Sequence, residues 1–122
     1  VQLTLAMPVE RLEAHPAVRQ DAGRVALQRG PMVYCLEQAD NGSNLEDVRL
    51  PREAELQAHW KPDLLGGVMI IRGEGRRRGR SGWGDRLYRS APPAEVPVEI
   101  VAVPYYAWAN REPGDMLVWI RE

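Results

Sequence analysis

The stretch Val96-Pro97-Val98-Glu99-Ile100-Val101-Ala102 decides the fold class of this chain. Apolar side chains recur in it at every second position, which places them on one face of an extended strand. They are Val96, Val98, Ile100 and Ala102. Downstream, Pro113-Gly114 is typical of a turn, and Met116 to Ile120 is expected to return as the hairpin partner of this strand.

Upstream, the same apolar alternation and short apolar runs predict further strands. They cover residues 1–7, 24–27, 32–36, 45–50, 54–60 and 68–71. Gly30-Pro31 splits two of them, and because proline lacks a backbone donor we expect a bulge or a sheet edge there. The stretch from Glu53 to His59 is short and lacks the apolar stripe of a helix, so a strand is favoured.

The connections between these strands carry strong turn signals. Asp40 to Asn44 contains Asn-Gly, the clearest of them. From Arg72 to Ala94 the pattern gives way to Gly, Arg, Ser and Pro, which indicates one long loop, functional or disordered. About eight short strands with little or no helix predict an all-β fold: an antiparallel β-sandwich of jelly-roll type, or a barrel.

Length and charge limit the class of protein. The chain has 122 residues, which is enough for one core. Its 16 cations and 17 anions nearly cancel, so neither nucleic acid nor an anionic membrane is expected as a partner. No apolar run approaches the ~20 residues of a membrane span, and no leader pattern is visible. Because the chain starts at Val1 rather than Met, we expect a fragment or a processed product.

Few side chains qualify for catalysis or for metal binding. Cys35 is the only cysteine, which excludes an internal disulfide and leaves the redox compartment undetermined. It lies between Tyr34 and Leu36 in an apolar strand, so a buried and unreactive thiol is expected. His15 and His59 have polar flanks and are expected to be solvated.

Residues 73–84, GEGRRRGRSGWG, suggest two other sites. A phosphate-binding loop needs a Gly-Lys-Ser/Thr step before a helix; that step is absent, and Pro92-Pro93 forbids the helix of a dinucleotide fingerprint. The arginines could neutralise phosphates, but the balanced net charge favours a solvated loop. We expect residues 72–90 to be poorly ordered unless they dock onto an acidic surface of a larger protein.

The aromatic residues are the best candidates for a contact surface. Tyr and Trp combine a flat apolar face with a polar tip, and without any Phe they must supply the aromatic packing. If residues 105–108 form a strand, Tyr106 and Trp108 share one face and Tyr105 takes the other. We favour core or interdomain packing over a carbohydrate platform. The contact candidates are Tyr105, Tyr106, Trp108, Arg111 and Trp83.

Two long sequence blocks together resemble one known family. The first runs from Gly23 to Glu37, and the second from Val103 to Arg111, followed by Met116 to Ile120. They resemble the C-terminal region of the β-L-arabinofuranosidase-like glycoside hydrolases, family 127 and its relatives. The resemblance implies a bacterial parent enzyme, of the cytoplasm or the periplasm, in which a large helical barrel carries catalysis and β-sandwich domains follow it.

The resemblance also sets expectations for this chain. The cysteine nucleophile, its zinc ion and the zinc ligands belong to the barrel, so no catalytic, cofactor-binding or metal-binding residue is expected here. Residues 1–22 would be the tail of the preceding sandwich, and residues 23–122 the C-terminal sandwich. That sandwich would support the barrel of an enzyme that removes arabinofuranose from plant-type glycans.

A second function stays open. A carbohydrate-binding module would use exposed Tyr and Trp side chains, so the exposure of Tyr106 and Trp108 distinguishes the two functions. A fragment also loses the neighbour that covers its apolar surface. We therefore expect the isolated chain to self-associate by edge pairing or by exchange of a terminal strand.

Overall fold

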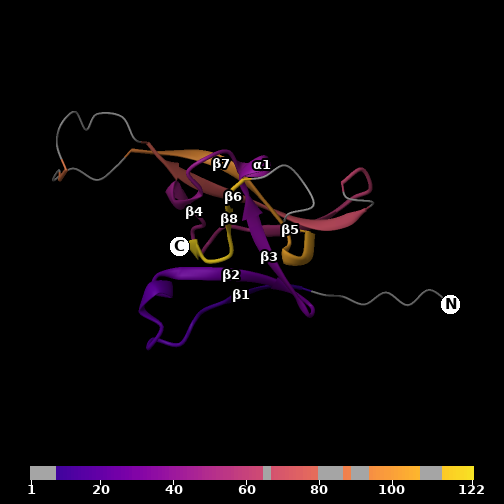
Figure 1. Ribbon diagram of the computed structural model, residues 1–122, viewed down its shortest axis with the longest axis horizontal. Helices are drawn as coiled ribbons and strands as arrows, with labels where there is room; N and C mark the ends of the chain where they lie inside the picture. Colours follow the sequence, from indigo (N-terminus) through magenta and orange to yellow (C-terminus); the bar gives the residue numbers. More distant parts are fainter. Residues whose placement is uncertain (1–7, 65–66, 80–86, 89–93, 108–113) are drawn as a thin grey trace.

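The fold is a β-sandwich, seen in a computed structural model that describes residues 8–64, 67–79, 87–88, 94–107 and 114–122. Strands β1 and β2 form one layer, strands β4 to β7 lie in the other, and β3 runs from the first layer to the second (Figure 1). The prediction of an all-β sandwich is confirmed. Among the described residues, no helix is long and apolar enough to cross a membrane.

Nine strands make up the sandwich in the described part of the chain. They are β1 (Val9–Leu12), β2 (Arg24–Arg29), β3 (Met32–Glu37), β4 (Val48–Arg49), β5 (Leu56–Lys61), β6 (Val68–Arg78), β7 (Glu95–Pro104), β8 (Met116–Leu117) and β9 (Ile120–Arg121). Helical residues occur only in short connections, namely α1 (Gln38–Asn41) and the 3-10 turns η1 (Arg19–Asp21), η2 (Leu45–Asp47) and η3 (Tyr105–Ala107).

The strands pair into a closed circuit. β2 pairs with β9, β9 with β4, β4 with β6, β6 with β7, β7 with β3, and β3 returns to β2. All of these pairs are antiparallel except β4–β9, which is parallel at Arg49 and Arg121. Strands β1, β5 and β8 lie outside the circuit, on β2, β6 and β3. Closure therefore removes most free strand edges.

A two-residue turn joins β2 to β3. Arg29 pairs with Met32, which leaves Gly30 and Pro31 as the turn. Gly30 has a φ of 60°, as the first position of a type II′ hairpin turn requires. The expected bulge or sheet edge at Pro31 is therefore wrong. Proline stands in the turn itself, where its missing N–H breaks no ladder hydrogen bond.

Strand β6 is longer than the sequence pattern indicates. Residues 72–78, which we expected in a loop, pair with β7 from Arg72 opposite Val101 to Arg78 opposite Glu95. The prediction is wrong here because Gly75 serves close packing rather than a turn. A Cβ atom at Gly75 would lie 2.9 Å from the carbonyl oxygen of Arg49. Residues 80–86 and 89–93 of the expected loop lie outside the described residues.

The connection between β3 and β5 differs in part from expectation. The Asn-Gly turn is confirmed, with Gly42 at a φ of 81° and Asn44 at 58°, although one turn of helix precedes it. The strand expected over residues 45–50 is reduced to Val48–Arg49, because Leu45–Asp47 forms the 3-10 turn that follows Asn44. The strand expected over residues 54–60 is confirmed as β5.

Apolar side chains form two clusters on opposite faces of the β3–β7–β6 part of the sheet. The main core lies between the layers and includes Ile71, Ile100 and Leu36. The second cluster lies on the outer face and consists of Cys35, Val68, Ile70 and Val103, with partly buried neighbours. Neighbouring residues fall into different clusters because side chains alternate along a strand. Cys35 is fully buried, as predicted.

Candidate functional site

Two of the five predicted contact residues are described, and both are exposed. Tyr105 and Tyr106 form η3 directly after β7, and their exposed fractions are 47% and 63%. The expected strand is wrong for these two residues, because a 3-10 turn replaces strand alternation and leaves both side chains outside the core. Trp108, Arg111 and Trp83 lie outside the described residues, and so does the whole of the first predicted strand, residues 1–7.

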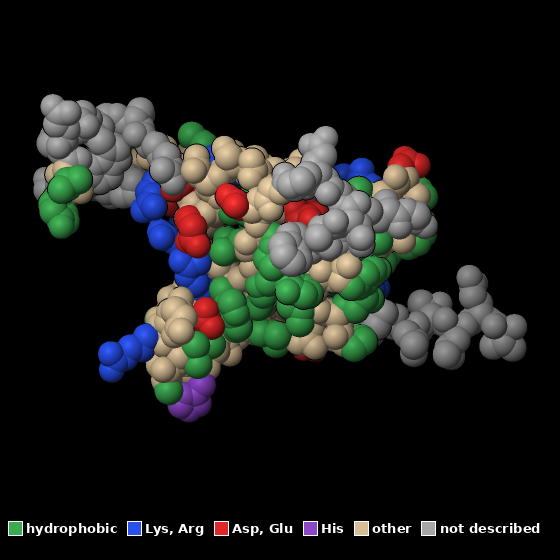
Figure 2. Space-filling model, in the orientation of Figure 1, with side chains coloured by type: hydrophobic (Ala, Val, Ile, Leu, Met, Phe, Trp, Pro, Cys, Tyr) green, Lys and Arg blue, Asp and Glu red, His purple; other side chains and the backbone are tan. Residues whose placement is uncertain are grey.

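Other apolar side chains surround η3 at the same end of the sandwich. Trp60, which is 59% exposed, is the second-last residue of β5 and lies opposite Met69, and Val33 is the second residue of β3, next to Tyr34. We call Val33, Trp60, Tyr105 and Tyr106 the aromatic end. Figure 2 shows hydrophobic side chains gathered in the middle of this view, over the place where η3 lies in Figure 1.

Tyr34 anchors the aromatic end to the core. Its ring is buried, and its hydroxyl donates a 2.9 Å hydrogen bond to the carbonyl oxygen of Met69. Burial raises the pKa of Tyr34; Arg29 opposes this rise and Tyr106 adds to it.

The chain enters the sandwich at the aromatic end. Val9, the first residue of β1, pairs with Arg29, and Arg29 precedes the turn that leads into Val33. β3 in turn places Tyr34 opposite Pro104, the residue before η3. Residues 9–12 therefore share a layer with β2, while the division of the chain at residue 22 stays a prediction.

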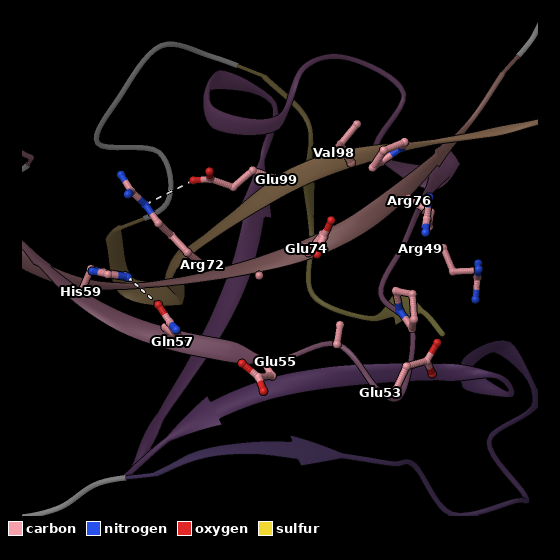
Figure 3. A pocket seen from close by; sticks show the side chains of 14 residues that line it. Arg49, Glu53, Glu55, Gln57, His59, Arg72, Glu74, Arg76, Val98 and Glu99 are labelled. Carbon is pink, nitrogen blue, oxygen red and sulfur yellow. Dashed lines mark hydrogen bonds and ion pairs between the residues drawn. The ribbon is translucent and has the colours of Figure 1, made fainter.

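A cleft of about 1040 Å³ opens on the edge of β6. β5 pairs with β6 as far as Gly73, and β4 pairs with it from Arg76 onward, so neither strand is in register with Glu74 or Gly75. Residues 50–55 connect β4 to β5 and are not paired with β6. In Figure 3, side chains from β4, β5, β6 and β7 surround the opening.

Arg11 of β1 holds one wall of the cleft. Its guanidinium donates hydrogen bonds to the carbonyl oxygens of Pro51, at 3.0 Å, and Ala54, at 2.6 Å. The backbone N–H of Leu50 also donates to the carbonyl oxygen of Arg121. These bonds fix residues 50–55 to the opposite layer, so the cleft is formed in the absence of any ligand.

Two ion pairs flank the cleft. Arg49 donates from Nε and Nη2 to the two carboxylate oxygens of Glu95, at 3.1 and 3.0 Å, and so ties β4 to β7 across β6. This hydrogen bonding lowers the pKa of Glu95 and raises that of Arg49. The Nε atom of Arg72 lies 3.3 Å from Oε1 of Glu99.

Sequence reasoning missed this cleft. The signal that could have found it is the alternation Arg72-Gly73-Glu74-Gly75-Arg76, which is a period-two pattern of charged and small residues. In a strand such a pattern puts every charge on one face and leaves room for a close neighbour on the other. We interpreted the glycines as loop residues instead.

No catalytic centre comes together among the described residues. They contain no group of three or more His, Cys, Asp or Glu side chains that could hold a metal ion. His15 and His59 are both exposed, as predicted, and Cys35 is enclosed in the outer apolar cluster. The described residues therefore do not fit the zinc site that the family resemblance implies for the barrel.

Comparison with known proteins gives consistent matches. The family model for the glycoside hydrolase family 127 C-terminal domain matches residues 9–121. The chain is 41% identical, over 126 residues, to the non-reducing end β-L-arabinofuranosidase of Bifidobacterium longum subsp. longum, covering 99% of this chain and 19% of that protein.

Comparison with solved structures gives the same family as the sequence comparisons. The family 127 β-L-arabinofuranosidase from Geobacillus stearothermophilus T6 superimposes with a TM-score of 0.91 at 56% identity, covering 96% of this chain and 18% of that one. A second family 127 β-arabinofuranosidase gives a TM-score of 0.82 at 34% identity, covering 95% and 17%.

The chain spans less than a fifth of the length of these relatives, and it matches them across nearly its whole length. The family model covers all nine described strands, from the first residue of β1 to the last residue of β9. The expected family is therefore confirmed. This chain belongs to glycoside hydrolase family 127 and is a C-terminal domain of that family.

Proposed function

We propose that this chain is a non-catalytic domain that supports the catalytic barrel of a family 127 glycoside hydrolase and packs, through its aromatic end, against the domain that precedes it. The single observation that carries the proposal is the coincidence of two features. The exposed Tyr105 and Tyr106 lie at the end of the sandwich where the polypeptide enters at Val9. An apolar patch beside a chain entry is well placed to pack against the domain to which the chain leads.

The reaction of the whole enzyme is part of the proposal. By similarity to the named relatives, it would release β-L-arabinofuranose from the non-reducing ends of plant-type glycans. Zinc and its cysteine ligands would lie in the barrel. The buried Cys35, which has no cluster of metal-binding side chains around it among the described residues, supports a structural role for this thiol.

The test compares three proteins on a chromogenic β-L-arabinofuranoside: the intact enzyme, the enzyme lacking this domain, and this domain alone. We expect turnover by the intact enzyme, a lower melting temperature with reduced turnover after deletion, and none from the domain. Turnover by the isolated domain would contradict the proposal. Unchanged stability and activity after deletion would show that the domain gives the barrel no support.

A second variant tests whether the aromatic end is the docking surface. Tyr105→Ser combined with Tyr106→Ser should lower the melting temperature of the intact enzyme by several degrees, because polar side chains cannot replace the buried ring area. Val18→Ser is the matched control, since Val18 is also exposed but lies in the connection between β1 and β2. Equal effects of the double variant and the control would contradict docking at the aromatic end.

The exposure of Tyr106 also favours the second function, a carbohydrate-binding module. A sugar can stack on an exposed tyrosine, and the sequence alone had favoured packing for this residue. The two functions differ in the intact enzyme. A docking surface is covered there, and the double tyrosine variant lowers stability. A sugar platform stays exposed, and the same variant loses glycan binding without loss of stability.

A further inference from the structure

The cleft beside β6 holds polar groups that the fold leaves unused. Glu55, Glu74 and Arg76 line it, and in the described part of the chain none of these three side chains makes a hydrogen bond or an ion pair. All three side chains are exposed. Folding therefore neither uses nor buries these groups, and they are available to a ligand.

The charge of the lining narrows the ligand class. Arg49 and Arg72 are matched by Glu95 and Glu99. The remaining charged groups of the lining are one cation against three anions: Arg76, Glu53, Glu55 and Glu74. A surplus of carboxylates repels phosphates, sulfates and acidic sugars. The cleft therefore suits a ligand that carries no negative charge, and we take the neutral case.

The hydrogen-bonding groups of the cleft further narrow the class of ligand. Carboxylates only accept and guanidinium groups only donate, so a ligand that satisfies both must do both. Hydroxyl groups have this property, and neighbouring hydroxyls on a sugar can bridge a carboxylate and a guanidinium. Gln57 and His59 of β5 add an amide and an imidazole to the same opening, as Figure 3 shows.

We propose that this cleft is an accessory binding site for a neutral oligosaccharide, separate from the aromatic end. The hydroxyls of the ligand would lie against Glu74 and Arg76 on β6 and against Glu55 at the start of β5. The wall held by Arg11 makes the site preformed, which lowers the entropic cost of binding. Neither Tyr105 nor Tyr106 lines the site.

The test is ligand-observed NMR with the intact polypeptide and a neutral arabino-oligosaccharide. Glu74→Gln keeps the size of the side chain, Arg76→Gln shortens it, and together they remove both charges. We expect this variant to bind about tenfold more weakly than the wild type, because two charge-assisted hydrogen bonds are lost. Glu10→Gln combined with Arg19→Gln is the matched control on the other side of the sandwich and should bind like the wild type.

The other outcomes are equally specific. An oligogalacturonate of the same length should bind more weakly than the neutral probe; tighter binding would contradict the charge argument. Equal affinity of wild type and cleft variant would show that the sugar binds elsewhere. Hydrolysis of a small chromogenic arabinofuranoside should be unchanged in the cleft variant. Absence of that activity from the wild type would instead contradict the proposed function of the whole enzyme.

Discussion

At the scale of single residues, Asn41 shows how one side chain can extend a sheet. β3 pairs with β7 through Leu36 opposite Ala102, and then the chain turns into α1. Asn41 supplies the next pair of bonds: its Nδ2 donates to the carbonyl oxygen of Val101, and its Oδ1 accepts from the N–H of Val101. A side-chain amide thus takes the place of a backbone amide on the neighbouring strand.

This geometry makes Asn41→Asp a damaging substitution. A carboxylate cannot donate to the carbonyl oxygens of Val101 and Glu37, both of which Nδ2 now serves. We expect the free energy of unfolding to fall by about 2 kcal/mol in urea denaturation. Asn44→Asp is the control, because Asn44 is exposed and its side chain makes no hydrogen bond to the sheet in the described part of the chain. Equal losses for the two variants would refute this role of the amide.

At the scale of single elements, β6 depends on two positions without side chains. A Cβ atom at Gly75 would meet the carbonyl oxygen of Arg49 and Cγ2 of Ile100, each at 2.9 Å. A Cβ atom at Gly73 would meet Cδ2 of Leu56, at the far end of a flexible side chain. Backbone atoms move less easily than a leucine methyl group, so Gly75 is the more restrictive of the two.

Gly75→Ala should therefore destabilise the domain by about 1–3 kcal/mol, the range for overpacking a well-filled site. Gly79→Ala is the matched control, because the nearest atom to its Cβ would be the carbonyl oxygen of Ala94 at an ordinary 3.5 Å. Thermal unfolding of the two variants measures the difference. A Gly75→Ala protein as stable as the control would mean that β4 shifts at no cost.

The pairing of β4 with β7 through Arg49 and Glu95 predicts a dependence on pH. Because hydrogen bonding from Arg49 lowers the pKa of Glu95 in the folded state, the pair stabilises the fold above the unfolded pKa of a glutamate. This contribution disappears as the pH falls through the lowered pKa. Glu95→Gln should remove it, at a cost below about 1 kcal/mol at neutral pH, because the pair is partly exposed and screened.

Urea denaturation at neutral and acid pH measures this effect. The difference between wild type and Glu95→Gln should shrink as the pH falls, whereas a difference that stays constant would assign the loss to packing. Glu10→Gln provides the comparison, because Glu10 is exposed on β1.

The elements also show what sequence could predict here. Strands β2, β3, β5 and β7 follow from apolar alternation or apolar runs, because each buries at least one face. Residues 72–78 escaped prediction because their buried face is made of glycines, which carry no hydrophobic signal. The alternation of charged residues and glycines over residues 72–76 could have indicated a strand with one charged face, but the position of the cleft depends on where β4 and β5 stop along β6, and register is not encoded in any one segment.

At the scale of the whole molecule, the exposed apolar end predicts self-association of the isolated chain. The aromatic end has no cover within the described residues, and the six-residue β5 leaves one edge unpaired there. We expect the average mass from light scattering to rise across a concentration series. A monomer at every concentration would contradict this expectation.

The double variant Tyr105→Ser with Tyr106→Ser separates the two causes. If the aromatic end drives association, the variant stays monomeric to higher concentration than the wild type, and Val18→Ser does not. If edge pairing or exchange of a terminal strand drives it, as we expected from the sequence, the tyrosine variant associates as the wild type does.

The position of β1 outside the closed circuit gives the domain a mechanical property. Tension on the polypeptide ahead of Val9 reaches only the four pairs between β1 and β2, while the circuit behind them stays shut. Arg11 lies within that short strand, and pulling it away frees the carbonyl oxygens of Pro51 and Ala54. Displacement of β1 would thus loosen the wall of the cleft that Arg11 holds, while the closed circuit of strands stays paired.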